Sequence, residues 1–178
     1  MHLEGSHIES QVIGPIRGAL GKSFFGVHYG LFAYELEALR SERREPLELD
    51  AEVRLQFAGG VQLFFSWTQV PGWVDINSLA VSTTSFLKAG AITYVDAHEF
   101  EYWRDCVGLT LTAVDVFGWR DTPAIARLRF DRSSLLVGVG YVQGYGDADS
   151  IIVRPDERMW LHTDSEADLL WSSSSEDA

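Results

Sequence analysis

The sequence predicts an α+β fold that is mainly β, made of two pseudo-repeated helix-plus-antiparallel-meander units packed as one compact domain. Three observations support this: alternating apolar and polar runs, helix signals ahead of each set of runs, and matching blocks in the two halves. The chain has 178 residues, which suits one core because domains usually run about 100 to 200 residues. We expect a single globular domain over 1–163, with pseudo-repeats at about 8–90 and 96–163, and an acidic Ser-rich tail at 164–178.

Blocks of the first half recur in the second half in the same order. The run from Arg17 to Val27 matches the run from Arg104 to Val114 at an offset of 87 residues, and 53–57 matches 126–130. Two further pairs of blocks are Trp67-Thr68-Gln69 with Tyr141-Val142-Gln143, and Ser78-Leu79-Ala80-Val81 with Ser150-Ile151-Ile152-Val153. Two interpretations stay open: two units folded against each other about a pseudo-twofold axis, and a generic likeness between amphipathic strands.

Each repeat is expected to open with a short helix. In the second half, Asp96 and Glu99 have the spacing of a capping arrangement, and apolar residues follow at helical spacing as far as Val107. The matching stretch of the first half, residues 9–20, is a poorer helix because a Gly-Pro pair interrupts it.

Strand signals dominate the rest of each half. Residues 47–57 alternate between apolar and polar side chains, and the alternation resumes over 61–67 after a glycine pair, which predicts a β-hairpin. The second half repeats this pattern over 125–130 and 135–141. Further strands are expected at 23–29, 31–39, 79–84, 91–95, 109–117, 150–153 and 159–162, with a charged linker at 40–46.

Composition and charge argue against several classes of function. The hydrophobic content of 46% is that of a globular protein rather than a disordered one. The net charge of −12 argues against nucleic-acid binding and would favour a basic protein partner, although plain solubility explains it equally well. No run approaches the roughly 18 apolar residues of a membrane helix. The N-terminus lacks the pattern of a secretory signal, so we expect a cytoplasmic protein that does not bind a membrane.

The sequence contains no recognisable catalytic, cofactor or metal motif. The five histidines do not have zinc-binding spacing, and a helix cap accounts for the carboxylates of Asp96-Ala97-His98-Glu99. The single cysteine, Cys106, is interpreted as a small core residue. The glycines of 138–144 lack the strand-turn-helix context of a nucleotide-binding loop. We therefore expect a protein that is not an enzyme and that uses no cofactor or metal.

The candidate partner-binding residues are aromatic and acidic side chains in predicted turns. Most of them follow the second strand of each hairpin. They are Trp73, Asp75, Trp119, Tyr145, Asp147 and Asp149. Aromatic side chains beside charges are typical of protein interfaces, while a turn that tucks its aromatic ring into the core explains the same pattern.

The second half resembles a family of known proteins. The order Trp103, Val107-Gly108, Val114, Leu128-x-Phe130 and Asp149-x-Ile151-x-Val153 is similar to that of small bacterial immunity proteins of polymorphic toxin systems. In those proteins a helix leads into a β-meander. The resemblance implies a non-catalytic inhibitor that binds and occludes a basic toxin or effector domain, with opposite charge hastening association.

A second hypothesis is a β-barrel-like module or enzyme that holds a small molecule between the two repeats. The aromatic residues that would line such a site are Phe64, Phe65, Trp67, Tyr141 and Tyr145. The same residues also fit a plain hydrophobic core. A third interpretation is a subunit of a larger assembly, such as a homodimer.

Overall fold

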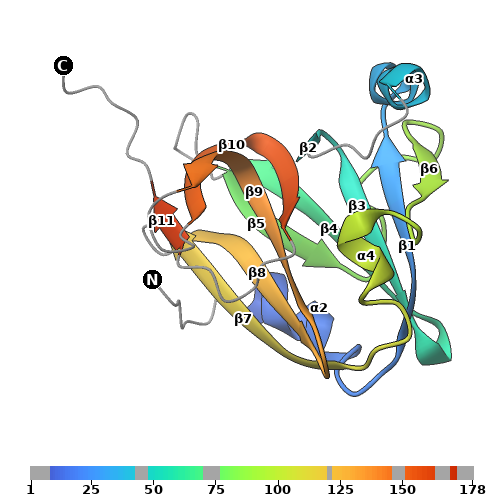
Figure 1. Ribbon diagram of the computed structural model, residues 1–178, viewed down its shortest axis with the longest axis vertical. Coiled ribbons are helices and arrows are strands. Elements are labelled where there is room, and N and C mark those ends of the chain that lie inside the picture. Colours follow the sequence, from blue (N-terminus) through green and yellow to red (C-terminus); the bar gives the residue numbers. More distant parts are fainter. Residues whose placement is uncertain are drawn as a thin grey trace.

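The computed structural model describes residues 9–42, 48–69, 77–119, 122–145, 151–162 and 169–171. Within these residues the chain forms two sheets with a few short helices around them (Figure 1). Sheet one has the strand order β5-β4-β3-β1-β6, and sheet two has the order β11-β10-β9-β8-β7, with β2 also paired to β10. The fold is therefore α+β and mainly β, as the sequence predicts.

The elements of sheet one are β1 (Phe24–Leu31), β3 (Glu52–Phe57), β4 (Val61–Gln69), β5 (Asn77–Ser82) and β6 (Thr93–Asp96). Those of sheet two are β2 (Glu48–Leu49), β7 (Leu111–Trp119), β8 (Thr122–Phe130), β9 (Ser134–Tyr145), β10 (Ile151–His162) and β11 (Leu169–Trp171). The helical elements are η1 (Glu9–Ile13), α2 (Gly14–Arg17), α3 (Ala33–Glu42), η2 (Ala58–Gly60) and α4 (Glu101–Arg104). None of the described helices is long and apolar enough to cross a membrane.

The meander of sheet one recurs in sheet two. Strands β1, β3, β4 and β5 lie side by side in chain order, and so do β7, β8, β9 and β10. Helix α2 precedes β1 and α4 precedes β7, and the two helices start and end 87 residues apart. We call residues 9–82, which contain α2 and the strands β1, β3, β4 and β5, unit one. We call α4 together with the strands β7, β8, β9 and β10 unit two.

Even an irregularity of the sheet is repeated. The register of β1 against β3 shifts between Phe24 and Gly26, and the register of β7 against β8 shifts between Leu111 and Ala113. These positions differ by the same 87 residues. A generic likeness between amphipathic strands would not place a bulge at the same step of both units.

The two units meet at a pseudo-twofold axis. Ser23 forms an isolated antiparallel bridge with Thr110, its own counterpart 87 residues later. Gly21 and Gly108, two residues earlier on each side, have φ angles of 75° and 86°. Because a side chain is disfavoured in this left-handed region, both units use glycine to turn into the junction.

Backbone hydrogen bonds at this junction obey the same symmetry. The Phe24 N–H donates to the Leu109 carbonyl at 2.8 Å, and the Leu111 N–H donates to the Lys22 carbonyl at 3.1 Å. Exchanging each residue for its counterpart 87 positions away converts the first bond into the second. The fold therefore contains the two pseudo-repeated units that the sequence predicts, joined by reciprocal contacts.

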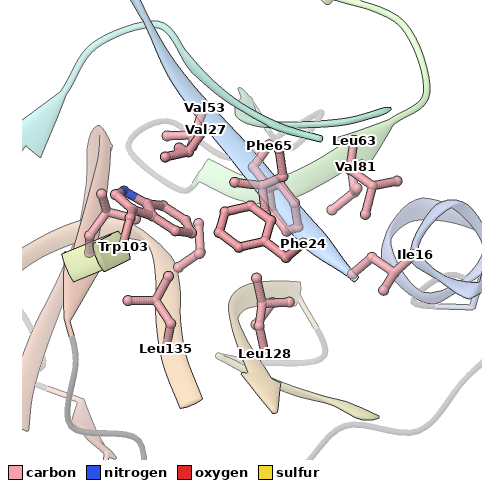
Figure 2. Packing of buried hydrophobic residues seen from close by; sticks show 14 of the residues in the cluster. Ile16, Phe24, Val27, Val53, Leu63, Phe65, Val81, Trp103, Leu128 and Leu135 are labelled. Atoms are coloured by element: carbon pink, nitrogen blue, oxygen red, sulfur yellow. The ribbon is translucent and has the colours of Figure 1, made fainter. Parts of the chain in front are cut away.

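One hydrophobic core lies between the sheets. Figure 2 shows Phe24 among side chains from both units, and its ring centroid lies 5.5 Å from Phe57, 5.7 Å from Trp103 and 5.6 Å from Phe130. The indole N–H of Trp103 donates to the Tyr29 hydroxyl at 2.7 Å, which satisfies two polar groups inside the core. Cys106 is also buried, as predicted.

Four local predictions were wrong. Asp96 and Glu99 do not cap a helix, because Asp96 ends β6 and α4 has Phe100 as its N-cap without a side-chain bond. The tail predicted at 164–178 contains β11, which pairs with β10 in sheet two.

The other two concern the segment after β1. The strand expected at 31–39 is instead the end of β1 followed by helix α3, whose residues are mostly good helix formers. The Glu35 carboxylate accepts the Phe32 N–H at 2.8 Å, which satisfies a backbone donor at the start of this helix. The linker predicted at 40–46 begins inside α3, and its remainder lies outside the described residues.

Candidate functional site

A pocket of about 610 Å³ lies where unit one meets the start of β8. Three aromatic side chains line it: Phe32 before α3, Trp67 on β4, and Phe86 from the connection between β5 and β6. Thr122 and Pro123 of β8 complete it from unit two. The pocket has the size and the mainly apolar lining of a small-molecule site.

The floor of the pocket belongs to the outer face of sheet one. Ser66 of β4 and Ala80 of β5 pair directly across the two strands, and both line the pocket. Their neighbours Phe65 and Leu79 point into the core, because side chains alternate along a strand. The Ser66 hydroxyl donates to the Ala51 carbonyl at 2.9 Å, so this buried oxygen is satisfied within the wall.

Hydrogen bonds tie three separate parts of the chain together at one end of the pocket. The Gln11 side-chain amide, from η1, donates to Ser78 Oγ at 2.8 Å and to the Leu79 carbonyl at 3.0 Å. Ser78 Oγ lies 3.2 Å from the Pro123 carbonyl of β8 and donates to it. This wall is therefore built by η1, β5 and β8 together.

The opposite end is built around Asp50. The Trp67 indole N–H donates to the Asp50 carbonyl at 2.9 Å, and the Tyr34 hydroxyl donates to the Asp50 carboxylate. Glu35 accepts the Asp50 N–H at 2.8 Å, and burial raises the pKa of the Glu35 carboxyl. These bonds hold the Trp67 ring in place as a wall of the pocket.

The connection between β5 and β6 crosses the outer face of sheet one, and we call its residues 83–92 the strap. The Glu52 carboxylate lies beneath it, fully buried. Glu52 accepts the Ser85 hydroxyl at 2.8 Å, the Phe86 N–H at 3.0 Å and the Tyr94 hydroxyl. Burial, and then the bond to Glu52, raise the pKa of the Tyr94 phenol, so it remains a donor at neutral pH.

The strap also depends on a glycine below it. A Cβ placed on Gly30 would lie 2.5 Å from Cδ1 of Ile92 and 3.2 Å from the Glu52 carbonyl oxygen. The absence of a side chain at Gly30 is therefore what lets Ile92 lie against the sheet. Arg54 stacks over the Tyr94 ring with 4.3 Å between its Cζ atom and the centroid.

A second polar cluster lies on the same face beside the strap. His98 contacts the Asp96 carboxylate at 2.6 Å and the Glu99 carboxylate at 2.8 Å, and the Asp96 bond raises the pKa of His98. His28 pairs across the strands with both Asp96 and Arg54, and burial followed by the Arg54 charge lowers its pKa. Among the described residues, no group of three or more His, Cys, Asp or Glu side chains could hold a metal ion.

The predicted partner-binding residues do not meet at a described site. Four of them, Trp73, Asp75, Asp147 and Asp149, lie outside the described residues. Trp119 ends β7 and Tyr145 ends β9, and the structure describes their backbone only. Partner binding by these six residues therefore stays a prediction.

The aromatic residues that were predicted to line a ligand site lie in different parts of the structure. Trp67 lines the pocket, whereas Phe65 packs in the core. Phe64 is buried on the outer face of sheet one and is not among the lining residues. For Tyr141 and Tyr145 only the strand position is described.

Sequence reasoning missed the remaining lining residues. The signal that could have found the floor is Ser66, a polar residue that stands between Phe65 and Trp67 in β4. Comparison of the chain with protein-family models, curated proteins and solved structures finds no match.

Proposed function

We propose that this protein is a binding module for a small, largely apolar molecule, which occupies the pocket between unit one and β8. The observation that carries the proposal is the pocket itself, because about 610 Å³ with three aromatic walls suits a drug-sized ligand. The hydroxyl groups of Thr68 and Thr122 at its lining can orient a polar substituent.

The position of the insertions supports the same function. In unit two, β7 ends at Trp119 and β8 begins at Thr122, so their connection is short. In unit one the equivalent strands β1 and β3 are separated by α3, and the strap is added after β5. Both additions contribute lining residues to the pocket. Loops added to a rigid repeated framework commonly carry binding groups.

The direct test is a titration with N-phenyl-1-naphthylamine, a neutral dye that brightens in apolar sites. We expect saturable binding of one dye per chain, with a change in tryptophan fluorescence from Trp67. The variant Ala80→Phe places a ring on the pocket floor and should abolish binding. Ala38→Phe is the control because Ala38 is exposed on α3, and thermal unfolding shows whether both variants fold.

Wild-type protein that shows no saturable binding would contradict this function. So would a folded Ala80→Phe variant that binds the dye as tightly as the wild type. Loss of binding in Ala38→Phe would indicate that the dye reports general surface hydrophobicity rather than the pocket.

A second candidate function is the acidic, non-catalytic interaction protein implied by the resemblance to immunity proteins. The net charge of −12 supports it, because long-range attraction speeds encounter with a basic partner. The test is binding to, and neutralisation of, the toxin encoded beside the gene, measured at low and high salt. Undiminished killing by that toxin in cells rich in this protein would contradict the candidate.

A further inference from the structure

We propose that the strap is a gate for the pocket, held against the sheet by the buried Glu52 carboxylate, and that ligand enters and leaves faster when these bonds open. The inference rests on the proposed binding function and names how that site is regulated. Phe86 and Leu87 of the strap form part of the pocket wall. Movement of the strap therefore changes access to the pocket.

We call the three hydrogen bonds to the Glu52 carboxylate the latch, and they lie near both ends of the connection between β5 and β6. Ser85 and Phe86 lie near the start of the strap, and Tyr94 lies just after its end in β6. All three donate to the one carboxylate of Glu52. A buried carboxylate must be fully hydrogen-bonded to be tolerated, so the sheet and the strap depend on each other here.

The strap has little else to hold it down. Leu87 and Ile92 are half-buried, and the other side chains of 83–92 are exposed. A segment that buries little apolar surface opens locally at low cost in free energy. Its far bend, where Gly90 has a φ angle of 85°, is stabilised by a bond from the Ala91 N–H to the Lys88 carbonyl.

The difference between the two units at the position of Glu52 also supports its role in holding the strap. Glu52 pairs with Gly30 across β3 and β1, and the corresponding pair in unit two is Ile125 with Phe117. An apolar Ile125 suits a strand without a strap. The carboxylate at position 52 thus occurs in the unit that has a segment to hold.

The experiment uses Tyr94→Phe, which removes one hydroxyl from the latch and keeps the ring under Arg54. Losing one hydrogen bond to a charged group should raise the strap's opening equilibrium about tenfold. We expect the association and dissociation rates of N-phenyl-1-naphthylamine both to rise about tenfold in stopped-flow measurements. The dissociation constant should change by less than about twofold, because a gate alters both rates together. Hydrogen exchange of the Phe86 amide should accelerate by the same factor.

Thr84→Ala is the matched control, since Thr84 lies in the strap and contacts Ser82 rather than Glu52. It should leave both rates unchanged. Ser85→Ala removes a second donor and should behave as Tyr94→Phe does. Unchanged dye rates in both latch variants would overturn the gate, and so would a weaker affinity with an unchanged association rate, which indicates a static wall. Wild-type protein that binds no dye contradicts the proposed function itself, whereas these outcomes contradict only the gate.

Discussion

Replacing Phe24 by alanine tests whether the two units share one core. Phe24 is fully buried and its ring contacts Phe57 of unit one and both Trp103 and Phe130 of unit two. Replacing a buried phenylalanine by alanine leaves a cavity and costs about 3 to 5 kcal/mol of stability. Its ring pairs place this residue toward the upper part of that range. We therefore expect Phe24→Ala to lower the free energy of unfolding by about 4 to 5 kcal/mol.

The neighbouring residue provides the control. Phe25 is 55% exposed, so Phe25→Ala should change the free energy of unfolding by about 0.5 kcal/mol or less. Urea unfolding followed by circular dichroism and by tryptophan fluorescence measures both effects. We expect one transition with coincident curves and an unchanged dependence on urea. A loss below about 1.5 kcal/mol for Phe24→Ala, or two separate transitions, would refute the shared core.

Three further predictions concern charge, the strap and the ligand. Because the Asp96 bond raises the folded-state pKa of His98, His98→Gln should lower the melting temperature at pH 5.5, and this loss should disappear as the pH rises through the raised pKa. Gly30→Ala should push Ile92 off the sheet, because the new Cβ would lie 2.5 Å from Ile92 Cδ1; we expect hydrogen exchange to accelerate more in the strap than in β3, and an equal acceleration in both would contradict this role of Gly30. The anionic dye 8-anilino-1-naphthalenesulfonate should bind at least about fivefold more weakly than its neutral analogue, because Asp50 lines the pocket and like charges about 4 Å apart repel by about 1 kcal/mol even in water.

The duplication could be predicted from the sequence because it depends on local patterns. The Arg-Leu-x-Phe blocks and the glycines at 21 and 108 recur at fixed offsets, and the structure places each at the same step of its unit. Two offsets were inexact. The hairpin partners of Arg54 and Arg127 are Phe64 and Leu136, which lie 72 residues apart, whereas the sequence blocks in this strand lie 74 apart. In the next strand Val81 pairs with Phe65 and Leu161 with Val137, so the equivalent residues lie 80 apart, whereas the matched blocks 78–81 and 150–153 lie 72 apart.

The pocket could not be predicted in the same way. Gln11, Ser66 and Pro123 meet in it from three distant parts of the chain, and single-sequence patterns report neighbours along a strand or helix. Glu52 presented the same difficulty, because in an alternating strand a polar residue is expected to face solvent. Its burial arises from the strap, whose position depends on contacts more than 30 residues away.

The two units show how one side of a symmetric framework could acquire a site. Arg54 and Arg127 are equivalent, and each lies over an aromatic ring. In unit two the ring is that of Phe117, on the adjacent strand. In unit one the position equivalent to Phe117 is Gly30, and the ring under the arginine comes from Tyr94 of β6, the strand that follows the strap. Strand β6, which the strap connects to β5, thus supplies the aromatic partner that the missing side chain would have provided. Replacing an aromatic residue at position 30 by glycine, with Tyr94 as the new partner, keeps Arg54 packed against a ring. The same replacement leaves room on the outer face of sheet one for the strap. The strap, Glu52 and the pocket therefore depend on a single structural change.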